Sequence, residues 1–191
     1  MAVWTIGHGT RATDELVETL VEAGARTLVD VRRFPGSRRN PQFNRRSLEH
    51  ALAGAGIAYR HAVELGGRLE GEPGEERFAC IRTPAFRSYA ARMGSERWQA
   101  ALADALAEPA PCLMCAETGW RDCHRSLIAE LLHARGENVV HLVRPGESEP
   151  HRPSRYAESH DGYLYLCGEP VEAEAPAAEF RLMQQRLFQG D

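Results

Sequence analysis

The sequence lacks any long hydrophobic run. No stretch of its 191 residues approaches the roughly 18 consecutive apolar residues that a membrane-spanning helix needs. The first apolar stretch ends at His8 and Arg11, too early to form the hydrophobic region of a secretory signal peptide. We therefore expect a cytoplasmic protein with no membrane partner.

Cysteine is scarce, and a net positive charge is absent. The five cysteines are an odd number at uneven spacings, in a chain long enough to bury a core without cross-links, so we expect reduced thiols. They are Cys80, Cys112, Cys115, Cys123 and Cys167. The formal net charge of −4 argues against a general nucleic-acid coat protein, although a total charge hides local differences.

Short apolar stretches alternate with helical patterns as far as residue 145. Residues 3–31 read as strand, helix and strand, a unit that is normally parallel and right-handed. Further strands are expected at 57–59, 112–115 and 139–143. Further helices are expected from Asn44 to about residue 54, over 86–106 and over 126–135. The sequence predicts an α/β fold, a single Rossmann-like domain with a mostly parallel sheet flanked by helices.

The composition changes after Pro145. Residues 146–191 are polar and irregular, and their later part is rich in Ala, Glu and Pro. We expect two parts, an α/β core domain over residues 1–145 and a C-terminal extension over 146–191. Residues 180–188 are predicted to form a short terminal helix in that extension.

Polar residues follow several predicted strands at the point where each strand ends. His8 follows the first strand, Asp30 and Arg32 end the second, and Cys115 and Glu117 end the strand before the 126–135 helix. In parallel α/β sheets, ligands bind in the crevice beyond the carboxyl ends of the strands. We expect these side chains to share a pocket there, although a cap or a turn would also explain any one of them.

The segment from Cys115 to Arg125 first suggests an anion site. Cys123, His124 and Arg125 stand at the start of a predicted helix, whose free N–H groups attract negative charge. Arg125 and Arg121 would add planar donors for phosphate or carboxylate. The same field would lower the pKa of the Cys123 thiol.

A second interpretation gives this segment a chemical step. Glu117 could act as a general acid or base, and a thiolate beside His124 or His8 could act as a nucleophile. Cys115 and Arg121 have the Cys-x5-Arg spacing of cysteine phosphatases. However, Glu117 within the loop would repel phosphate and the indole at position 120 is bulky for a phosphate cradle, so this chemistry is not favoured.

A third interpretation is a metal site that uses Cys115, Cys123, His124 and His8. Cys112 and Cys115 match the Cys-x2-Cys pattern of zinc sites, but within a strand their side chains would point to opposite faces. A metal is therefore not favoured, and no cofactor is expected. It also stays open that the cysteines only pack in the core and that Glu117 only forms a salt bridge.

Residues 32–46 form a long basic loop without acidic residues. Its six arginines are Arg32, Arg33, Arg38, Arg39, Arg45 and Arg46. Arginine suits planar recognition of phosphate or carboxylate, and Phe34 and Phe43 could stack on a base. A solvated surface loop paired with acids elsewhere is the alternative.

These motifs, taken together, form a pattern that resembles the domain of unknown function 488 family. The matching stretches are Thr5-Ile-Gly-His8, Asp30-Val-Arg32 with Pro35 and Ser37, Phe43, Tyr59 with Leu65-Gly66-Gly67, Cys115-Ala-Glu117, Cys123-His124-Arg125 and His141. The resemblance covers roughly residues 3–143. It implies a compact α/β domain with a shared pocket at these positions, and it implies no reaction.

We therefore expect an enzyme that binds an anionic, phosphate-bearing substrate, such as a nucleotide or nucleic acid, and hydrolyses a glycosidic or phosphoester bond. The candidate catalytic residues are Glu117, Asp30, Cys115, Cys123 and His8. The candidate substrate-binding residues are Arg32, Arg33, Ser37, Arg38, Phe43, Arg121, His124 and Arg125. A non-catalytic nucleic-acid or partner-binding module that uses the 32–46 loop is the alternative, and a metal-binding thiol protein is the third hypothesis.

Overall fold

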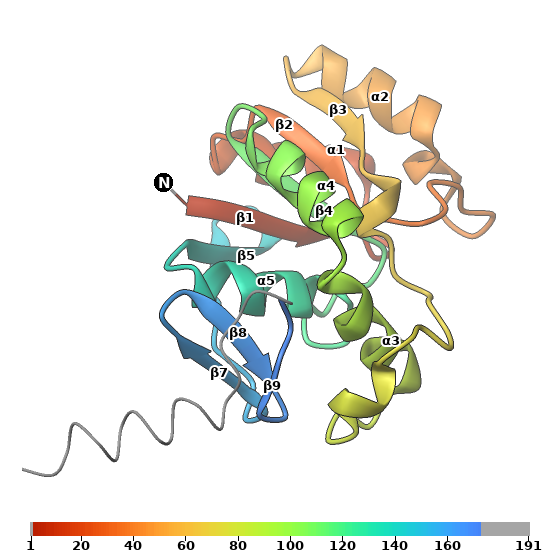
Figure 1. Cartoon of the computed structure of the whole chain (residues 1–191). Coiled ribbons are helices and arrows are strands. Elements are labelled where there is room, and N and C mark those ends of the chain that lie inside the picture. Colours follow the sequence, from red (N-terminus) through yellow and green to blue (C-terminus); the bar gives the residue numbers. More distant parts are fainter. Residues whose placement is uncertain (1, 173–191) are drawn as a thin grey trace, which may run out of the picture.

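A six-stranded sheet runs through the centre of the molecule, which a computed structural model describes over residues 2–172 (Figure 1). Its strands are β1 (Ala2–Gly7), β2 (Thr27–Asp30), β3 (Ala58–His61), β4 (Pro111–Cys115), β5 (Asn138–Arg144) and β6 (Glu147–Pro150). They lie in the order β3-β2-β4-β1-β5-β6. All neighbours are parallel except β5 and β6, which are antiparallel. The predicted α/β class and mostly parallel sheet are confirmed.

Helices cover both faces of this sheet. The α-helices are α1 (Thr13–Glu22), α2 (Arg45–Gly54), α3 (Pro84–Met93), α4 (Glu96–Leu106) and α5 (Arg125–Ala134). Three short 3-10 helices are η1 (Pro41–Phe43), η2 (Val63–Leu65) and η3 (Glu75–Phe78). The buried side chains of α1 and α2 belong to one core cluster, and those of α3, α4 and α5 belong to the other.

Strand β4 shows how the sequence supplies both cores. Successive side chains of a strand point to opposite faces. Cys112 and Met114 accordingly join the core under α1 and α2, while Leu113 and Cys115 join the core under α3 to α5. A strand that is buried on both faces needs a continuous apolar sequence, which explains why this stretch shows no polar alternation.

The predicted helix over 86–106 is two helices in the structure. Helix α3 ends at Met93, and Ser95 begins α4 as an N-cap whose hydroxyl accepts a hydrogen bond from the backbone N–H of Trp98. A Cβ atom at Gly94 would lie 2.3 Å from the carbonyl oxygen of Val171, so the chain needs glycine where it turns. The predicted helical character is therefore confirmed, and the break follows from the glycine and from the capping serine.

The sheet continues beyond the predicted core boundary at residue 145, because β6 pairs with β5. A separate antiparallel sheet of β7 (Ala157–His160), β8 (Tyr163–Leu166) and β9 (Glu169–Pro170) follows. It lies beside α5 in Figure 1. The helix predicted over 180–188 lies outside the described residues.

A disulfide joins Cys80 to Cys167, which are 87 residues apart in the sequence. It links the segment after η3 to the turn between β8 and β9. The prediction that all five thiols are reduced is therefore wrong for this pair. Sequence spacing could not reveal it, because only folding brings the two residues to a Cα–Cα distance of 5.7 Å. Cys112, Cys115 and Cys123 are free and buried.

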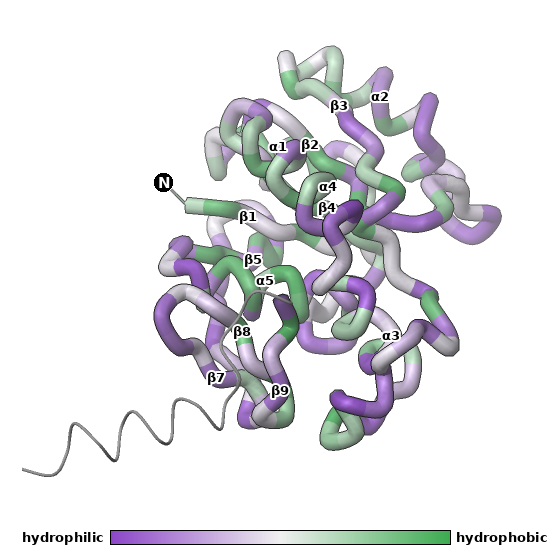
Figure 2. The backbone as a smooth tube through the Cα atoms, viewed as in Figure 1, coloured by the Kyte–Doolittle hydropathy of each residue, from purple (hydrophilic) through white to green (hydrophobic). Residues whose placement is uncertain are grey.

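Hydropathy follows this arrangement. Figure 2 shows hydrophobic residues along α5 and hydrophilic residues along the loop that leaves β2. Over residues 2–172, no helix combines the length and the apolar character that crossing a bilayer requires.

Candidate functional site

The ends of β1, β2 and β4 meet at one edge of the sheet, as the parallel topology requires. The chain stays paired beyond the strands: the backbone N–H of His8 donates to the carbonyl oxygen of Cys115 at 3.0 Å, and that of Val31 donates to Met114 at 2.9 Å. The structure thus brings His8, Asp30 and Cys115 to the same edge, together with the residues that follow each of them. This edge of the sheet forms the crevice in which α/β proteins of this kind bind ligands.

Asp30 and Arg32 form a buried ion pair at the end of β2. Arg32 donates from Nε to Asp30 Oδ1 at 2.8 Å and from Nη2 to Oδ2 at 2.6 Å. The hydroxyl of Tyr59 donates to the same carboxylate at 2.8 Å. Burial raises the pKa of Tyr59, and the Asp30 charge raises it further. Asp30 has no exposed surface, so it organises the site from behind rather than facing a ligand.

The remaining donors of Arg32 are also largely used. Its Nη2 donates to the carbonyl oxygen of Phe43 at 2.9 Å, and its Nη1 donates to Nε2 of His8 at 3.1 Å. Burial alone would lower the pKa of Arg32, but the hydrogen bonds and charge of Asp30 raise it. Arg32 is therefore a permanent cation that positions His8 and the 32–46 loop.

His8 is neutral and held on both ring nitrogens. Its Nδ1–H donates to the carbonyl oxygen of Gly9 at 2.9 Å, which leaves Nε2 to accept the hydrogen bond from Arg32. Burial lowers the pKa of His8. The ring of Phe43 stacks on His8 at 4.4 Å between centroids and is itself fully buried. Phe43 thus supports His8 and presents no face on which a base could stack.

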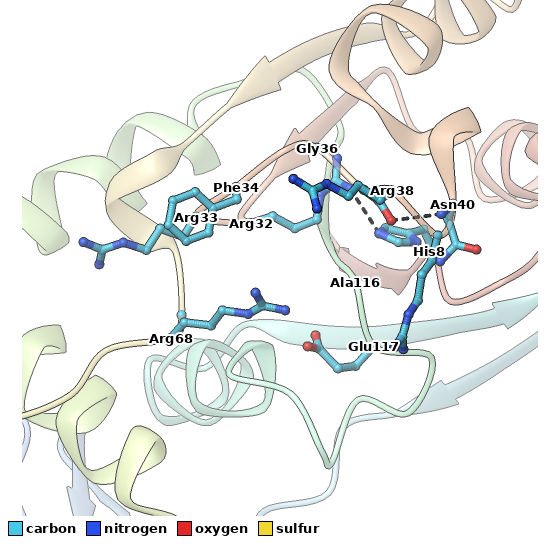
Figure 3. Close-up of a pocket in the computed structure, with 13 residues that line it drawn as sticks. His8, Arg32, Arg33, Phe34, Gly36, Arg38, Asn40, Arg68, Ala116 and Glu117 are labelled. Atoms are coloured by element: carbon cyan, nitrogen blue, oxygen red, sulfur yellow. Dashed lines mark hydrogen bonds between the residues drawn. The ribbon is translucent and has the colours of Figure 1, made fainter.

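A cavity of about 360 Å³ opens in front of these residues (Figure 3). Its charged lining consists of Arg32, Arg33, Arg38, Arg39, Arg68 and Glu117. The first four come from the basic loop after β2, Arg68 comes from the loop after η2, and Glu117 comes from the loop after β4. His8, Phe34 and Ser37 also line it, and Phe34 is 62% exposed.

Four of these arginines are free to meet a ligand. Arg33, Arg38, Arg39 and Arg68 are exposed, and within residues 2–172 no carboxylate forms an ion pair with them. Figure 3 shows Arg68 and Glu117 pointing toward one another from opposite sides of the cavity. The cavity therefore carries an excess of positive charge.

Sequence reasoning missed Arg68. It adopts a φ of 62°, a left-handed backbone conformation that is strained for a residue with a side chain. Such strain often marks a functional position, but only the structure reveals it. The one signal in the sequence was the adjacent Gly66-Gly67 pair, which allows close backbone approach: a Cβ at Gly66 would lie 2.8 Å from the backbone of Arg33.

Ser37 shapes the basic loop. Its backbone N–H donates to Asn44 Oδ1 at 2.6 Å, and its hydroxyl accepts from the backbone N–H of Asn40 at 3.0 Å. These bonds fold the loop back toward α2, so that Arg38 and Arg39 reach the cavity.

Arg125 does not face the cavity, because it is buried under the loop after β4. It donates from Nη1 to the carbonyl oxygen of Glu117 at 2.6 Å and from Nη2 to that of Thr118 at 2.8 Å, and Nη1 also contacts the sulfur of Cys115. A Cβ at Gly7 would lie 2.7 Å from Nη1. Arg125 therefore fixes the loop that carries Glu117.

The two cysteines of this segment are also buried. Cys115 is fully buried and Cys123 is 1% exposed, and their sulfur atoms lie 2.6 Å apart. Burial, followed by the hydrogen bond and charge of Cys115, raises the pKa of Cys123. The prediction that the helix terminus lowers this pKa is wrong, because burial and the neighbouring Cys115 raise it.

His124 is neutral and has a defined tautomer. Its Nε2–H donates to the carbonyl oxygen of Val31 at 3.0 Å, so Nδ1 carries the lone pair and lies 3.5 Å from the sulfur of Cys123. Burial lowers the pKa of His124. Its ring is therefore a hydrogen-bond acceptor or a ligand rather than a cation for an anion.

Glu117 is the exposed member of this group. Burial alone would raise the pKa of its carboxyl, but hydrogen bonds from the Cys123 thiol, from its own backbone N–H and from the Cys115 thiol lower it. Glu117 is therefore a carboxylate near neutral pH. A donor atom from each of Cys115, Glu117 and Cys123 lies within 4.8 Å of the others, close enough to share a metal ion.

Arg121 lies apart from the cavity. Its guanidinium stacks over Trp120 at 4.0 Å and pairs with Glu149 at 3.4 Å. Because Cys115 is buried, the Cys-x5-Arg spacing does not form the exposed thiol and phosphate loop of a cysteine phosphatase.

The fold and the site define an α/β protein with a basic, partly enclosed pocket at the carboxyl ends of its strands. Residues 12–132 match the profile of a family described as Domain of unknown function DUF488, and the chain belongs to this family. The matched region contains most of the pocket, while His8 and His141 lie outside it. Neither the curated proteins nor the solved structures contain a match to the chain.

Proposed function

We propose that the protein is an enzyme that binds a phosphate-bearing substrate, such as a nucleotide or a nucleic-acid end, in this basic pocket and hydrolyses it. The observation that carries the proposal is the set of four unpaired arginines around the cavity. Arg32 is neutralised by Asp30, so Arg33, Arg38, Arg39 and Arg68 face a single carboxylate.

This excess suits a ligand with two or more negative charges. Guanidinium groups bind phosphate through paired hydrogen bonds, and bonds of this kind contribute roughly 1.5–3 kcal/mol each. A cavity of about 360 Å³ has room for a nucleotide-sized group rather than for a bare phosphate alone. Phe34, exposed at its edge, offers a face on which a base could stack.

Glu117 supplies the base in this proposal. As a carboxylate, it accepts a proton from a water molecule whose oxygen bonds to the atom under attack. The bond to the leaving group breaks with its electron pair, and the leaving group takes up the proton from Glu117. The thiols and Asp30 have no contact with the substrate in this scheme.

Binding is tested by calorimetry with inorganic pyrophosphate at low salt. We expect the Arg38→Ala/Arg39→Ala variant to bind at least about a hundredfold more weakly, since each of the two lost arginine contacts removes more than about 1.4 kcal/mol. Arg26→Ala/Arg82→Ala is the matched control, because both residues are exposed and lie outside the cavity. If both variants lost the same affinity for pyrophosphate, the effect would come from the change in net charge alone, and the proposal would be overturned.

Hydrolysis is tested with nucleoside mono-, di- and triphosphates and with short single-stranded DNA, by following released products. Glu117→Gln should lower the rate by about 10²–10⁴-fold with little change in binding. A non-catalytic nucleic-acid module is the second candidate, favoured by the exposed Phe34 beside exposed arginines. It would stand if the wild type binds these probes and hydrolyses none, with affinity for DNA that falls as salt rises.

A further inference from the structure

Three donors gather beside the pocket at the two ends of the connection from β4 to α5. Cys115 ends β4, and Cys123 and His124 lead directly into α5. The two sulfur atoms lie 2.6 Å apart, and the sulfur of Cys123 lies 3.5 Å from Nδ1 of His124. All three side chains are largely or completely buried, so water competes little for them.

The ring of His124 is prepared to act as a ligand. Its Nε2–H donates to the backbone carbonyl of Val31, the arrangement by which metal-bound histidines fix their tautomer. The free lone pair on Nδ1 then points toward Cys123. Two bonds of about 2.3 Å and 2.05 Å at a tetrahedral angle separate sulfur and nitrogen by about 3.5 Å, which the observed distance matches.

The absence of a side chain at Gly67 lets the backbone pack closely against the His124 ring. A Cβ atom at this position would lie 2.7 Å from Nδ1 and 2.9 Å from Cγ of His124. Any other residue would push the ring aside. Gly67 also lines the cavity, so the His124 ring lies directly behind one wall of the pocket.

The charges of this region balance with two neutral thiols, one carboxylate and Arg125, and they also balance when a divalent cation binds two thiolates. Arg125 is 1% exposed, and its contacts are carbonyl oxygens and the sulfur of Cys115, with no carboxylate among its hydrogen-bond partners in the described chain. Two thiolates and Glu117 carry three negative charges. A divalent cation and Arg125 carry three positive charges, so the group as a whole is neutral.

We infer that Cys115, Cys123 and His124 bind a thiophilic divalent cation of the zinc type, with a fourth position that faces Glu117 and the pocket. Two cysteines and a histidine with an open position are typical of catalytic zinc rather than of closed structural sites. Binding requires the sulfurs to move apart from 2.6 Å to about 3.8 Å, the separation of two thiolates on one tetrahedral ion. It also requires His124 to approach Cys115, because the donors that already lie within 4.8 Å of one another are Cys115, Glu117 and Cys123.

Cys112 has no part in this site. It belongs to the opposite core cluster, so the Cys-x2-Cys pattern within β4 divides between two faces of the sheet. The second cysteine ligand is therefore Cys123 and not Cys112. A substitution of Cys112 serves as a control for the loss of a cysteine outside the site.

The inference deepens the proposed function, since it rests on that function for the use of the bound water. A water on the cation would give its proton to the Glu117 carboxylate, and the hydroxide left on the cation would be the attacking group. Metal coordination lowers the pKa of water to about 7, which makes hydroxide available at neutral pH. The cation binds without substrate in this scheme. An absence of cation binding can therefore be distinguished from an absence of anion binding in the pocket.

Cobalt(II) provides the test, because cysteine-bound cobalt gives intense near-ultraviolet bands and tetrahedral cobalt gives visible bands. Reduced, full-length protein is titrated with Co²⁺ without oxygen, and Zn²⁺ is then added. We expect bands that saturate at one equivalent and disappear with zinc. Cys112→Ala should behave like the wild type. Cys123→Ser and His124→Gln should bind at least about tenfold more weakly.

A folded variant that keeps Cys115, Cys123 and His124 gives a second measurement. Gly67→Ala should lose the bands while circular dichroism stays unchanged, because its Cβ displaces the His124 ring. The inference is overturned if wild-type protein with titratable thiols shows no thiolate bands. Bands that persist in Cys123→Ser, or Cys115 and Cys123 recovered as a disulfide that reductant does not open, would overturn it as well.

Discussion

At the residue scale, the pocket depends on the carboxylate of Asp30, which does not itself line the cavity. Asp30 accepts hydrogen bonds from the backbone N–H and side chain of Arg32 and from the hydroxyl of Tyr59. Through Arg32, these bonds hold His8 and the start of the basic loop. A fully buried carboxylate requires all of these donors, because an unmatched charge is expensive inside a protein.

Tyr59→Phe removes one of those donors without changing the shape of the site. We expect the free energy of unfolding to fall by about 1.5–3 kcal/mol, the range for a hydrogen bond to a charged group. Urea denaturation followed by circular dichroism measures it. Tyr163→Phe in β8 is the control, because the Tyr163 hydroxyl forms no hydrogen bond with residues 2–172. Equal effects of the two substitutions would contradict this role for Asp30.

The direction of individual side chains is the part that the sequence could not predict. Strand-end positions were enough to group His8, Asp30 and Cys115, because parallel strands end at one edge. Arg125 and Arg121 both stand near the start of α5, yet one is buried under the loop and the other pairs with Glu149. That difference depends on the path of the loop, which no periodic pattern encodes.

At the scale of elements, the small β7-β8-β9 sheet is attached to the main domain by the Cys80–Cys167 disulfide. Cross-links that close long loops stabilise mainly by restricting the unfolded chain. Cys80→Ser/Cys167→Ser should therefore lower the free energy of unfolding by about 2–4 kcal/mol. Denaturation with and without reductant checks this, and reductant should have no effect on the variant. Free thiols at both positions in the unreduced wild type would contradict the pairing.

The alternation of strands and helices in the sequence made the type and order of the elements in the main sheet predictable. The residues at which each element begins and ends were harder to predict. The helical pattern of 86–106 was correct in type but concealed the break at Gly94, where the nearby Val171 carbonyl leaves no room for a side chain. Strand β6 is polar, and its pairing with β5 depends on backbone hydrogen bonds, which leave no hydrophobic pattern.

At the scale of the whole molecule, a buried polar chain joins the sheet, α5 and the segment after β6. The hydroxyl of Thr5 lies 2.6 Å from Nδ1 of His141, whose Nε2 lies 3.1 Å from Nδ1 of His151. His151 in turn lies 3.2 Å from the carboxylate of Glu130. Burial, and then the neighbouring charges of His151, Arg125 and Arg121, lower the pKa of His141 to about 3.

This shift predicts how stability depends on pH. An unfolded histidine takes up a proton below about pH 6.5, whereas folded His141 stays neutral until about pH 3. The contribution of His141 to stability should therefore be complete above pH 6.5 and fall by up to about 1.4 kcal/mol per pH unit as the pH approaches 3, and His8 and His124, whose pKa values are also lowered, add to the slope. His141→Gln should make this slope shallower by about one proton's contribution, and exposed His50→Gln should not. Parallel slopes in all three proteins, measured by denaturant unfolding, would refute the assignment.

The central claim for the whole molecule is that anions bind at the carboxyl ends of β1, β2 and β4. Amide chemical shifts of isotope-labelled protein, recorded during titration with pyrophosphate, locate the bound anion directly. The largest changes should fall on residues 33–39, on Gly67 and Arg68, and on Ala116 and Glu117, which surround the cavity. Changes centred elsewhere, or spread evenly over exposed arginines, would contradict the account.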